Sequence, residues 1–395
     1  MKIMYFSGSF WRETKGGSQK HVYEMVKRAR KKFDVIEVYQ TNEKIKNAYT
    51  IREINTSLLY ISHEITSAIL MPLNVYMASK GLSSLIASLK PDVFHTQVFS
   101  PYIPKNSSLK KVVTLHDIRG FFYEKPSPLS NFYFAPSPYH ARKICETCRK
   151  FDAILCVSET TKCDAIRCMP FLKDREIYTV YNGVDSQKFS PHQDTSNLKD
   201  SLLENYDIDV DREFIILVPG RINFVKGQDL AIKAFNKLPK YIKTKAHLLI
   251  VGYITDRKYF LSLKTSKNNI TLITNVKDIA QYYAIADIVV VPTRHYEGFC
   301  LVAAEGLASG KPVIVTDQPV TREVCGELAV YVPPLKYDGI YHLHPNDIAS
   351  KIVYLYENED LRNKIGSKGR AMVKQRFSWD KTFKKTQRIY ETLTS

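Results

Sequence analysis

The segment Pro292–Asp317 places the strongest constraint on the fold of this chain. A β-branched run, Ile288–Val291, comes directly before it, and a second run, Val313–Thr316, lies near its end. Between the two runs, Gly310 stands where a helix would stop. This pattern predicts a strand–helix–strand unit, and parallel-sheet proteins bind ligands at the carboxyl ends of such strands.

Two glutamates, Glu297 and Glu305, fall within this segment. Glu297 is expected on the loop at the end of the first strand, and Glu305 about two turns into the helix. Both are therefore expected near the carboxyl end of that strand, where a ligand would bind. Carboxylates accept hydrogen bonds from paired hydroxyl groups. The two acids therefore suit a polyhydroxylated ligand.

Length and charge narrow the class of protein. A chain of 395 residues is long enough for two domains, and 44% hydrophobic with 25% charged residues is typical of a soluble globular protein. The formal charge of +17 favours an anionic partner, such as a nucleotide, a phosphate, an acidic lipid surface or a nucleic acid. No zinc-finger, RNP or basic-zipper pattern occurs, so nucleic acid is not the expected partner.

The hydropathy pattern and the cysteines indicate a cytoplasmic protein with reduced thiols. No apolar run reaches the ~18 residues that span a bilayer, and the start of the chain reads as a strand and not as a secretory signal. Seven cysteines, an odd number, favour free thiols over disulfides. Cys145, Cys148, Cys163 and Cys168 are close enough in sequence to hold zinc, but the spacing of the second pair is wrong for it, so unligated thiols are expected.

Strands alternate with helices in two series, separated by a polar stretch at 185–212 that reads as a linker. The alternation predicts an α/β protein with two doubly wound, Rossmann-like domains that face a central cleft. The expected N-terminal domain is 1–190 and the expected C-terminal domain is 191–375. The final segment, 376–395, is expected to form a helix that crosses back to the N-terminal domain.

Local patterns give the expected elements. Four prolines between Gly120 and Tyr139 predict a loop. The expected helices include Ser62–Leu89, Gly227–Leu238 and one that starts near Ser378. The expected strands are Lys2–Ser7, Val35–Tyr39, Val93–His95, Lys111–Leu115, Ala153–Val157, Ile177–Val180, Phe214–Val218, His247–Val251, Asp287–Pro292 and Val313–Thr316.

The segment Leu217–Gly227 ends a strand, turns at a glycine and carries two cations before the next helix. Arg221 and Lys226 can both reach a phosphate at the N-terminus of that helix, where backbone amides attract anions. Each can equally be a solvated surface residue. Their place in the same predicted domain as Glu297 favours a ligand site.

The N-terminal half offers further candidates. Gly16 and Gly17 precede a helix and let backbone amides approach an anion, although the GxGxxG pattern of dinucleotide oxidoreductases is missing. His116 follows a strand, where the site residues of open sheets lie, and a structural role is its alternative. His95 is a second-rank candidate, and His21 is expected to pack on the apolar side of its helix.

Together these motifs resemble glycosyltransferase family 4, retaining enzymes of the two-domain GT-B fold, over nearly the whole chain. The paired glutamates and the glycine–arginine…lysine–glycine segment are specific in combination. The motifs that carry the resemblance are Gly16–Gly17, VVTLHD at 112–117, CVSE at 156–159, YNGVD at 181–185, GRINFVKG at 220–227 and EGFCLVAAE at 297–305.

The resemblance implies a nucleotide-sugar donor bound mainly by the C-terminal domain. Arg221 and Lys226 would neutralise its diphosphate, Glu297 would hold sugar hydroxyls, and Glu305 would take the ribose hydroxyls. The family usually has glycine where this chain has Cys300, which leaves the loop geometry and the sugar preference open. The implied catalytic residues are His116, Glu297, Arg221 and Lys226, and the implied donor-binding residues are Gly16, Gly17, Arg221, Lys226, Glu297, Gly298, Phe299, Cys300, Leu301 and Glu305.

The resemblance also implies a UDP- or GDP-sugar donor, a glycan or lipid-linked acceptor, and front-face substitution in which the departing phosphate assists the acceptor. No acidic metal-binding motif is evident, so neither a metal nor another cofactor is expected. The alternatives are a sugar-nucleotide 2-epimerase or a phosphorylase of the same layout, and a non-catalytic partner subunit.

The helix Ser18–Lys32 is strongly basic. Such a run is typical of a solvated face. It also suits peripheral contact with an anionic membrane at the inner face of the cell membrane, as a lipid-linked acceptor would require. The basic residues are Lys20, Lys27, Arg28, Arg30, Lys31 and Lys32.

Overall fold

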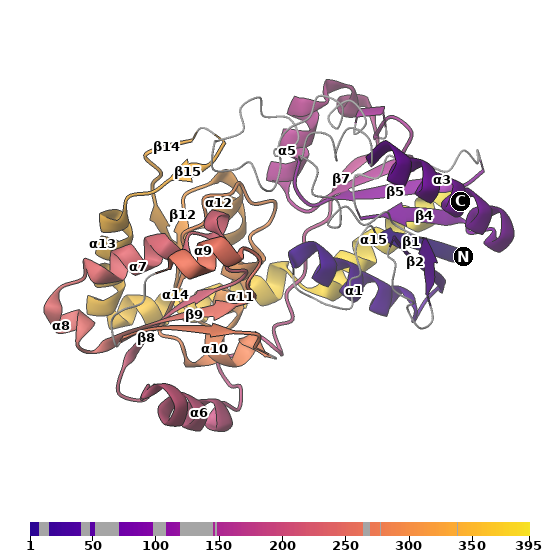
Figure 1. Ribbon diagram of the computed structural model, residues 1–395. Helices are drawn as coiled ribbons and strands as arrows, with labels where there is room; N and C mark the ends of the chain where they lie inside the picture. Colours follow the sequence, from indigo (N-terminus) through magenta and orange to yellow (C-terminus); the bar gives the residue numbers. More distant parts are fainter. Residues whose placement is uncertain are drawn as a thin grey trace. The chain divides into compact units, whose positions relative to one another are not determined.

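The computed structural model describes residues 1–7, 16–40, 48–51, 71–97, 108–118, 145–146, 148–263, 269–276, 278–337 and 339–395. These residues form two compact units, each described here by itself (Figure 1). The first unit contains the described residues up to Tyr181 together with Trp379–Ser395. The second contains the described residues of Asn182–Ser378.

The first unit is built on a seven-stranded parallel sheet in the spatial order β3-β2-β1-β4-β5-β6-β7. Successive strands run outward from β1 in one direction and then outward from β4 in the other. The sheet is therefore doubly wound, with its switch point between β1 and β4. The strands are β1 (Lys2–Ser7), β2 (Asp34–Gln40), β3 (Tyr49–Ile51), β4 (Val93–Thr96), β5 (Lys110–Leu115), β6 (Ala153–Cys156) and β7 (Ile177–Thr179).

Each face of this sheet has its own core, because successive side chains on a strand point to opposite faces. Met4 and Phe6 pack on the face covered by α3 and α5. Ile3 and Tyr5 pack on the face covered by α1 and α15. The helices of the unit are α1 (Gly17–Ala29), α3 (Met71–Leu89), α5 (Glu159–Cys168), the 3-10 helix η4 (Pro170–Asp174) and α15 (Trp379–Thr394).

The C-terminal helix α15 completes the core of the first unit. It lies beside α1, and Phe383, Ile389 and Tyr390 are buried against the sheet. The hydroxyl oxygens of Tyr390 and Tyr5 lie 3.0 Å apart in this core. The last helix of the chain is therefore an integral part of the N-terminal unit.

The second unit repeats the design with a six-stranded parallel sheet in the order β10-β9-β8-β11-β12-β13. Its switch point lies between β8 and β11, which pair with each other. A two-stranded antiparallel hairpin, β14–β15, lies outside the sheet. The strands are β8 (Phe214–Pro219), β9 (Ala246–Gly252), β10 (Ile270–Thr274), β11 (Ile288–Val291), β12 (Val313–Thr316), β13 (Val330–Val332), β14 (Lys336–Tyr337) and β15 (Tyr341–His342).

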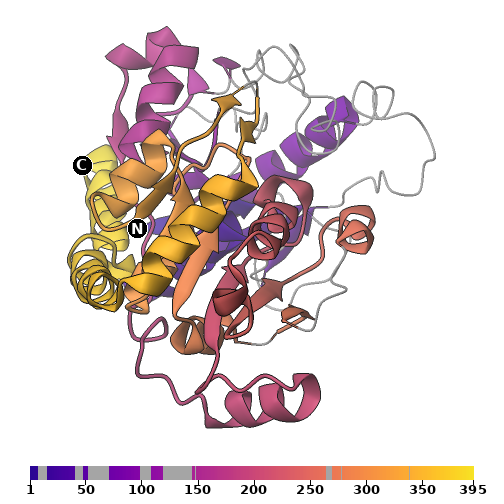
Figure 2. The same ribbon diagram turned by 90° about the vertical axis from the view of Figure 1, so that its left-hand side faces the viewer.

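Helices cover both faces of the second sheet. Helix α13 lies against α7 on one face (Figure 2), and α11 lies against α14 on the other. Opposite faces are expected, because right-handed crossovers on the two sides of a switch point place their helices on opposite faces. The helices are α6 (Ser196–Tyr206), η5 (Phe224–Lys226), α7 (Gln228–Asn236), α8 (Lys240–Lys243), α9 (Arg257–Ser262), α10 (Ile279–Ile285), α11 (Leu301–Ala308), α12 (Pro319–Cys325), α13 (Pro345–Glu357) and α14 (Glu359–Arg376).

The predicted fold class, an α/β protein with two doubly wound parallel sheets, is confirmed. The predicted strands Lys2–Ser7 and Val313–Thr316 have the bounds that the sequence indicated, and the other eight agree to within one residue at each end. The strands β3, β10 and β13 were not predicted. They are edge strands of the two sheets, and β3 and β13 are only three residues long.

One prediction was wrong. The stretch 185–212, interpreted as a linker, contains helix α6. The sequence of this helix lacks the apolar stripe by which helices are recognised, and only Leu202 is buried. The predicted loop 120–139, the first part of the predicted helix Ser62–Leu89 and most of the loop before Gly16 lie outside the described residues.

None of the described helices combines the length and the apolar character that a bilayer crossing requires.

The packing of α15 generates a test of the fold. We expect Tyr390→Ala to lower the free energy of unfolding by about 3–5 kcal/mol, because it empties a large site in the core of the first unit. Lys385→Ala on the exposed side of the same helix should change it by less than about 0.5 kcal/mol. Urea unfolding of the two variants measures the difference. Equal effects would mean that α15 is not part of this core.

Candidate functional site

The candidate site of the second unit lies at the carboxyl ends of β8 and β11. The two strands are neighbours in the sheet, with Ile288 paired to Ile216 and Val289 to Leu217. Polypeptide leaving β8 carries Arg221 and Lys226, and polypeptide leaving β11 carries Glu297. Residues 71 or more positions apart in sequence are therefore delivered to one edge, at the switch point of the sheet.

A close backbone contact holds the two loops together. Gly227 has a φ of 73°, and a Cβ atom at this position would lie 2.1 Å from the carbonyl oxygen of Pro292. Only glycine is compatible with both features. Just before it, the side chain of Asn223 accepts a hydrogen bond from the Lys226 amide at 3.2 Å and caps the 3-10 turn η5. The turn that presents Lys226 is thus fixed at both of its ends.

Lys226 and Glu297 form an ion pair across these loops. Lys226 Nζ lies 2.5 Å from Glu297 Oε1, and each side chain is about one-sixth exposed (16% and 15%). The Thr293 hydroxyl donates to the same carboxylate oxygen at 3.2 Å, and Gln318 Oε1 accepts from the Glu297 amide at 3.1 Å. Lys226 and Thr293 therefore hold the carboxylate, and Gln318 holds the backbone of the same residue.

The electrostatics keep Glu297 ionised. Burial acts to raise the pKa of its carboxyl, but the positive charge of Lys226, followed by His295 and Arg221, lowers that pKa below its usual value. Arg221 is exposed on the same loop as Lys226, five residues before it. The structure therefore brings Lys226 and Glu297 into direct contact, with Arg221 on the loop that carries Lys226.

Glu305 lies on α11 and has a different set of contacts. It is buried, with 8% of its surface exposed, and the Tyr283 hydroxyl lies 3.3 Å from Glu305 Oε2. Cys300 is near both acids. Burial is the main cause that raises the pKa of the Cys300 thiol to about 12, and the charges of Glu297 and Glu305 raise it further.

The loop that joins the two acids has an unusual conformation. Cys300 is the N-cap of α11 and has a φ of 60°, in the left-handed region that favours glycine. Gly298 and Phe299 before it are buried, and the Phe299 ring contacts Phe377 edge-on at 5.2 Å. Leu301 begins the helix. Cys300 thus adopts the backbone conformation that glycine would adopt without strain.

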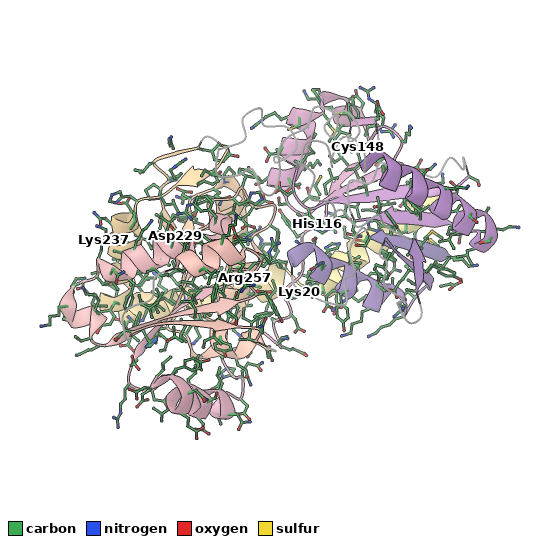
Figure 3. All side chains as sticks on the ribbon, viewed as in Figure 1. Lys20, His116, Cys148, Asp229, Lys237 and Arg257 are labelled. Atoms are coloured by element: carbon green, nitrogen blue, oxygen red, sulfur yellow. The ribbon has the colours of Figure 1, made fainter. Side chains whose placement is uncertain are left out.

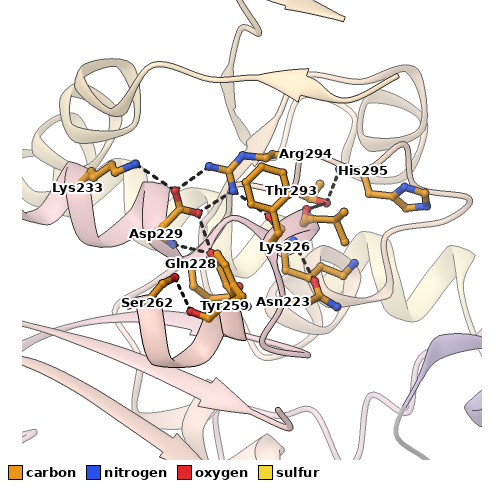
Figure 4. Close-up of polar contacts among 12 residues, drawn as sticks. Asn223, Lys226, Gln228, Asp229, Lys233, Tyr259, Ser262, Thr293, Arg294 and His295 are labelled. Carbon is orange, nitrogen blue, oxygen red and sulfur yellow. Dashed lines mark hydrogen bonds and ion pairs between the residues drawn. The ribbon is translucent and has the colours of Figure 1, made fainter. Parts of the chain in front are cut away.

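Asp229 and Arg294, called the loop clamp below, were not predicted from sequence (Figure 4). Arg294 Nη1 and Nη2 donate to Asp229 Oδ1 and Oδ2 at 2.7 and 2.8 Å. Arg294 also lies over the Phe224 ring, 4.3 Å from its centroid. Tyr259 donates to Asp229 Oδ1 at 2.7 Å. The presence of one acid at the start of a helix and one arginine after a strand gave no sign of this pairing.

The candidates of the first unit lie at the carboxyl edge of their own sheet. Gly16 is the N-cap of α1 and Gly17 its first residue. His116 directly follows β5 (Figure 3), and its Nε2 lies 3.2 Å from Gln97 Oε1. The ring of His21 lies edge-on to that of His116, 4.9 Å away.

The imidazole of His116 is neutral near pH 7. Removal of the ring from water, followed by the neighbouring His21 and His95, lowers its pKa well below the usual value. His95 is fully buried in β4, where its Nε2 lies 2.8 Å from Thr114 Oγ1. His95 and His21 therefore contribute to the core, and His21 packs on the apolar side of its helix as predicted.

None of the seven cysteines forms a disulfide. Cys148, Cys156, Cys300 and Cys325 are buried, and Cys163 is exposed. Within the part of the chain that the structure describes, no three or more His, Cys, Asp or Glu side chains are grouped closely enough to hold a metal ion.

Two family models match this chain. "Glycosyltransferase Family 4" matches residues 15–188, and "Glycosyl transferases group 1" matches residues 204–372. The chain belongs to glycosyltransferase family 4. The first model covers the loop and strands that lead to His116, and the second covers Arg221, Lys226, Glu297 and Glu305.

Relatives and solved structures agree with this family. The capsular polysaccharide biosynthesis glycosyltransferase CapM of Staphylococcus aureus is 31% identical over 221 residues, 53% of each chain. Sucrose-phosphate synthase of Thermosynechococcus elongatus superimposes with a TM-score of 0.78 at 19% identity, over 99% of this chain and 98% of the other. HepE of Anabaena, solved with UDP and glucose, gives a TM-score of 0.72 at 18% identity over 100% of both chains.

The structural likeness shows that the fold is GT-B. The chain spans about three-fifths of the length of several curated relatives that it matches.

The loop clamp generates a prediction about stability and pH. Burial acts to raise the pKa of Asp229, but Arg294, with Tyr259 and Lys233, lowers it to about 2. Because the pKa is lower in the folded state than the ~3.9 of an unfolded chain, the clamp stabilises fully above about pH 4 and loses this contribution as the pH falls toward 2. The difference corresponds to about 2 kcal/mol.

We expect the free energy of unfolding of the wild type to fall by about 2 kcal/mol more than that of Asp229→Asn between about pH 5 and pH 2. Urea unfolding at a series of pH values measures this slope. Parallel profiles for the two proteins would contradict the prediction.

Proposed function

We propose that this protein is a retaining glycosyltransferase that moves a sugar from a nucleoside-diphosphate sugar to a hydroxyl group of a glycan or lipid-linked saccharide. One observation carries the proposal: the ion pair of Lys226 and Glu297, with Arg221 on the same loop as Lys226, at the switch point of a Rossmann-like sheet. Cations suit a diphosphate, and a carboxylate suits sugar hydroxyls. The site places a cation, Lys226, and a carboxylate, Glu297, within ion-pair distance of each other.

The donor is proposed to bind with its diphosphate toward the cations. Arg221 and Lys226 would neutralise the charge that builds on the leaving diphosphate, because preorganised donors aimed at developing charge lower the barrier. Glu297 would accept hydrogen bonds from sugar hydroxyls, and Glu305 from the ribose. The backbone amides of Gly298, Phe299, Cys300 and Leu301 would complete the donor site.

Lys226 has two roles in this proposal. Without donor it neutralises Glu297, which keeps a largely buried carboxylate ionised. With donor it would divide its charge between this carboxylate and the diphosphate. The ion pair thus supports a Glu297 that is already deprotonated, and therefore already an acceptor of hydrogen bonds, when the sugar arrives.

The first unit is proposed to supply Gly16, Gly17 and His116. The neutral imidazole of His116 suits a hydrogen bond to the transferring sugar better than proton transfer from an imidazolium. We propose front-face substitution, in which the departing phosphate takes the proton of the acceptor hydroxyl. No metal or other cofactor is needed in this scheme. An isolated covalent glycosyl-enzyme intermediate would count against it.

The choice of donor class is supported by similar proteins. HepE of Anabaena has been solved with UDP and with UDP-glucose, and we propose a UDP- or GDP-sugar for this chain. CapM acts in capsular polysaccharide biosynthesis, and RfbU of Salmonella typhimurium, 28% identical over 232 residues, is an O-antigen chain mannosyltransferase. These names support a glycan or lipid-linked acceptor.

Transfer itself is the test. We expect one or more UDP- or GDP-sugars to raise the melting temperature of the protein, and mass spectrometry to detect a glycosylated acceptor when that donor is combined with lipid-linked saccharides. Arg221→Ala should lower turnover by about 100-fold, the scale for losing one preorganised donor to developing charge.

The outcomes separate the alternatives. Rearrangement or hydrolysis of the donor without an acceptor would indicate a 2-epimerase of the same fold, and a requirement for phosphate would indicate a phosphorylase. Failure to bind any sugar nucleotide in calorimetry would indicate a non-catalytic partner subunit. Near-normal turnover of Arg221→Ala would remove this residue from the mechanism.

A lipid-linked acceptor would bring the protein to an anionic membrane, and the basic helix α1 supports this part of the proposal. Lys27 on α1 is exposed, and so are Lys31 and Lys32 in the turn that follows this helix. Two arginines of the same run are engaged, since Arg28 bonds Glu24 and Asp380, and Arg30 bonds Glu37. The neighbouring α15 exposes Lys384, Lys385 and Arg388. The lysines therefore provide most of the charge available to a membrane.

We expect the protein to float with vesicles that contain anionic lipid at low salt and to be released at high salt, because each basic residue near such a surface contributes about 1 kcal/mol, screened by ions. Lys27→Glu with Lys31→Glu should weaken recovery, while vesicles of neutral lipid serve as the control. No recovery with anionic vesicles at low salt would remove membrane contact from the proposal.

A further inference from the structure

The loop clamp joins the two loops that carry the candidate donor-binding residues. Asp229 lies three positions after Lys226, and Arg294 three positions before Glu297. The clamp is largely buried, with 9% of the Arg294 side chain and 20% of the Asp229 side chain exposed. A bidentate arginine–carboxylate pair in such a setting fixes direction as well as distance.

The hydrogen bonds of Arg294 and its neighbour extend to the peptide groups next to Lys226. Arg294 Nη1 donates to the Phe224 carbonyl at 2.8 Å, and the Arg294 amide donates to the Val225 carbonyl at 2.7 Å. The Thr293 hydroxyl lies 3.2 Å both from the Val225 carbonyl oxygen and from Glu297 Oε1. The backbone directly before Lys226 is thus tied to the loop that carries Glu297.

Aromatic side chains support the clamp on its other side. The Phe224 ring lies under the guanidinium at 4.3 Å, and Tyr259 stands edge-on to Phe224 at 6.1 Å. The Tyr259 hydroxyl donates to Asp229 Oδ1 and accepts from the Asp229 amide at 2.9 Å. The Asp229 carboxylate therefore has charge-assisted partners on both oxygens, and rotation of either side chain would break several contacts at once.

We propose that Asp229 and Arg294 are positioning residues, which set the spacing between Lys226 and Glu297 at which one donor molecule can contact both. This inference rests on the proposed function of the site. It assigns no contact with the donor to the clamp itself. An arginine is required, because a lysine ammonium is a single point that cannot hold both carboxylate oxygens and a carbonyl in one plane.

The test replaces the geometry of the clamp while keeping its charge. In Arg294→Lys we expect UDP to bind about tenfold more weakly in calorimetry, because a bidentate arginine is not replaced by lysine. Asp229→Asn should act in the same direction and serves as a second variant. Binding is measured well below the melting temperature of each variant, so that lost stability alone does not lower it.

A matched control is Arg322→Lys. Arg322 also holds a carboxylate with two hydrogen bonds, to Asp317 at 2.8 and 2.7 Å, and lies 3.6 Å over the Tyr331 ring. It belongs to the same unit but is half exposed (49%). The same substitution in a similar pair should leave UDP affinity within about twofold of wild type, since surface substitutions are usually small in effect.

A double-mutant cycle shows whether the clamp acts through Lys226. If it does, Arg294→Lys should cost little further affinity in a Lys226→Ala protein, because the residue to be positioned is gone. Full additivity of the two losses would overturn the inference. So would wild-type UDP affinity in both Arg294→Lys and Asp229→Asn.

A ligand-free readout separates this inference from the proposed function. The charge of Lys226 lowers the pKa of Glu297, so displacement of Lys226 in Arg294→Lys should raise that pKa. Carbon-13 NMR of the carboxyl groups, assigned with Glu297→Gln, measures it. An unchanged Glu297 pKa would overturn the inference. Absence of nucleotide binding in the wild type would instead overturn the proposed function, and the titration would still decide the role of the clamp.

Discussion

The approach of Gly227 to the Pro292 carbonyl is the contact on which the candidate site depends. It exists because β8 and β11 pair side by side, so that the polypeptides leaving them meet at one edge. A side chain at Gly227 would force the loops apart and separate Lys226 from Glu297. The charge pair, the lowered pKa of Glu297 and the buried clamp all require this close approach of two backbones.

The close approach of the two loops places Lys226 next to Glu297, and this pairing allows a charged acid to be partly buried. An isolated buried carboxylate would shift its pKa upward and take up a proton. Lys226, with Arg221 and His295 nearby, reverses that shift. The clamp likewise keeps Asp229 ionised despite its burial. The guanidinium of Arg294 faces both carboxylate oxygens and lowers the pKa of Asp229 to about 2.

Much of the fold was predictable, because buried parallel strands are short β-branched runs. The run Val313–Thr316 in the middle of a sheet is an example. Edge strands such as Tyr49–Ile51 and the nearly unburied helix α6 were not predictable, since neither carries a continuous apolar pattern. Their place is decided by pairing and packing that involve distant parts of the chain.

The candidate site shows the same division. Lys226 and Glu297 follow neighbouring strands, so their contact could be expected once the strands were known to be neighbours. The link between Asp229 and Arg294 could not, because it depends on the path of two loops and on the Phe224 ring between them. The left-handed backbone of Cys300 was likewise invisible, although the glycine usual at this position in the family was a hint of it.

The position of α15 has a consequence for biosynthesis. The chain enters the second unit after Tyr181 and returns to the first only at Trp379. Since domains usually fold as they emerge from the ribosome, the N-terminal unit would emerge first yet lack Phe383 and Tyr390 in its core. Its final consolidation must therefore wait until Trp379–Ser395 have been translated, after the second unit is already available to fold.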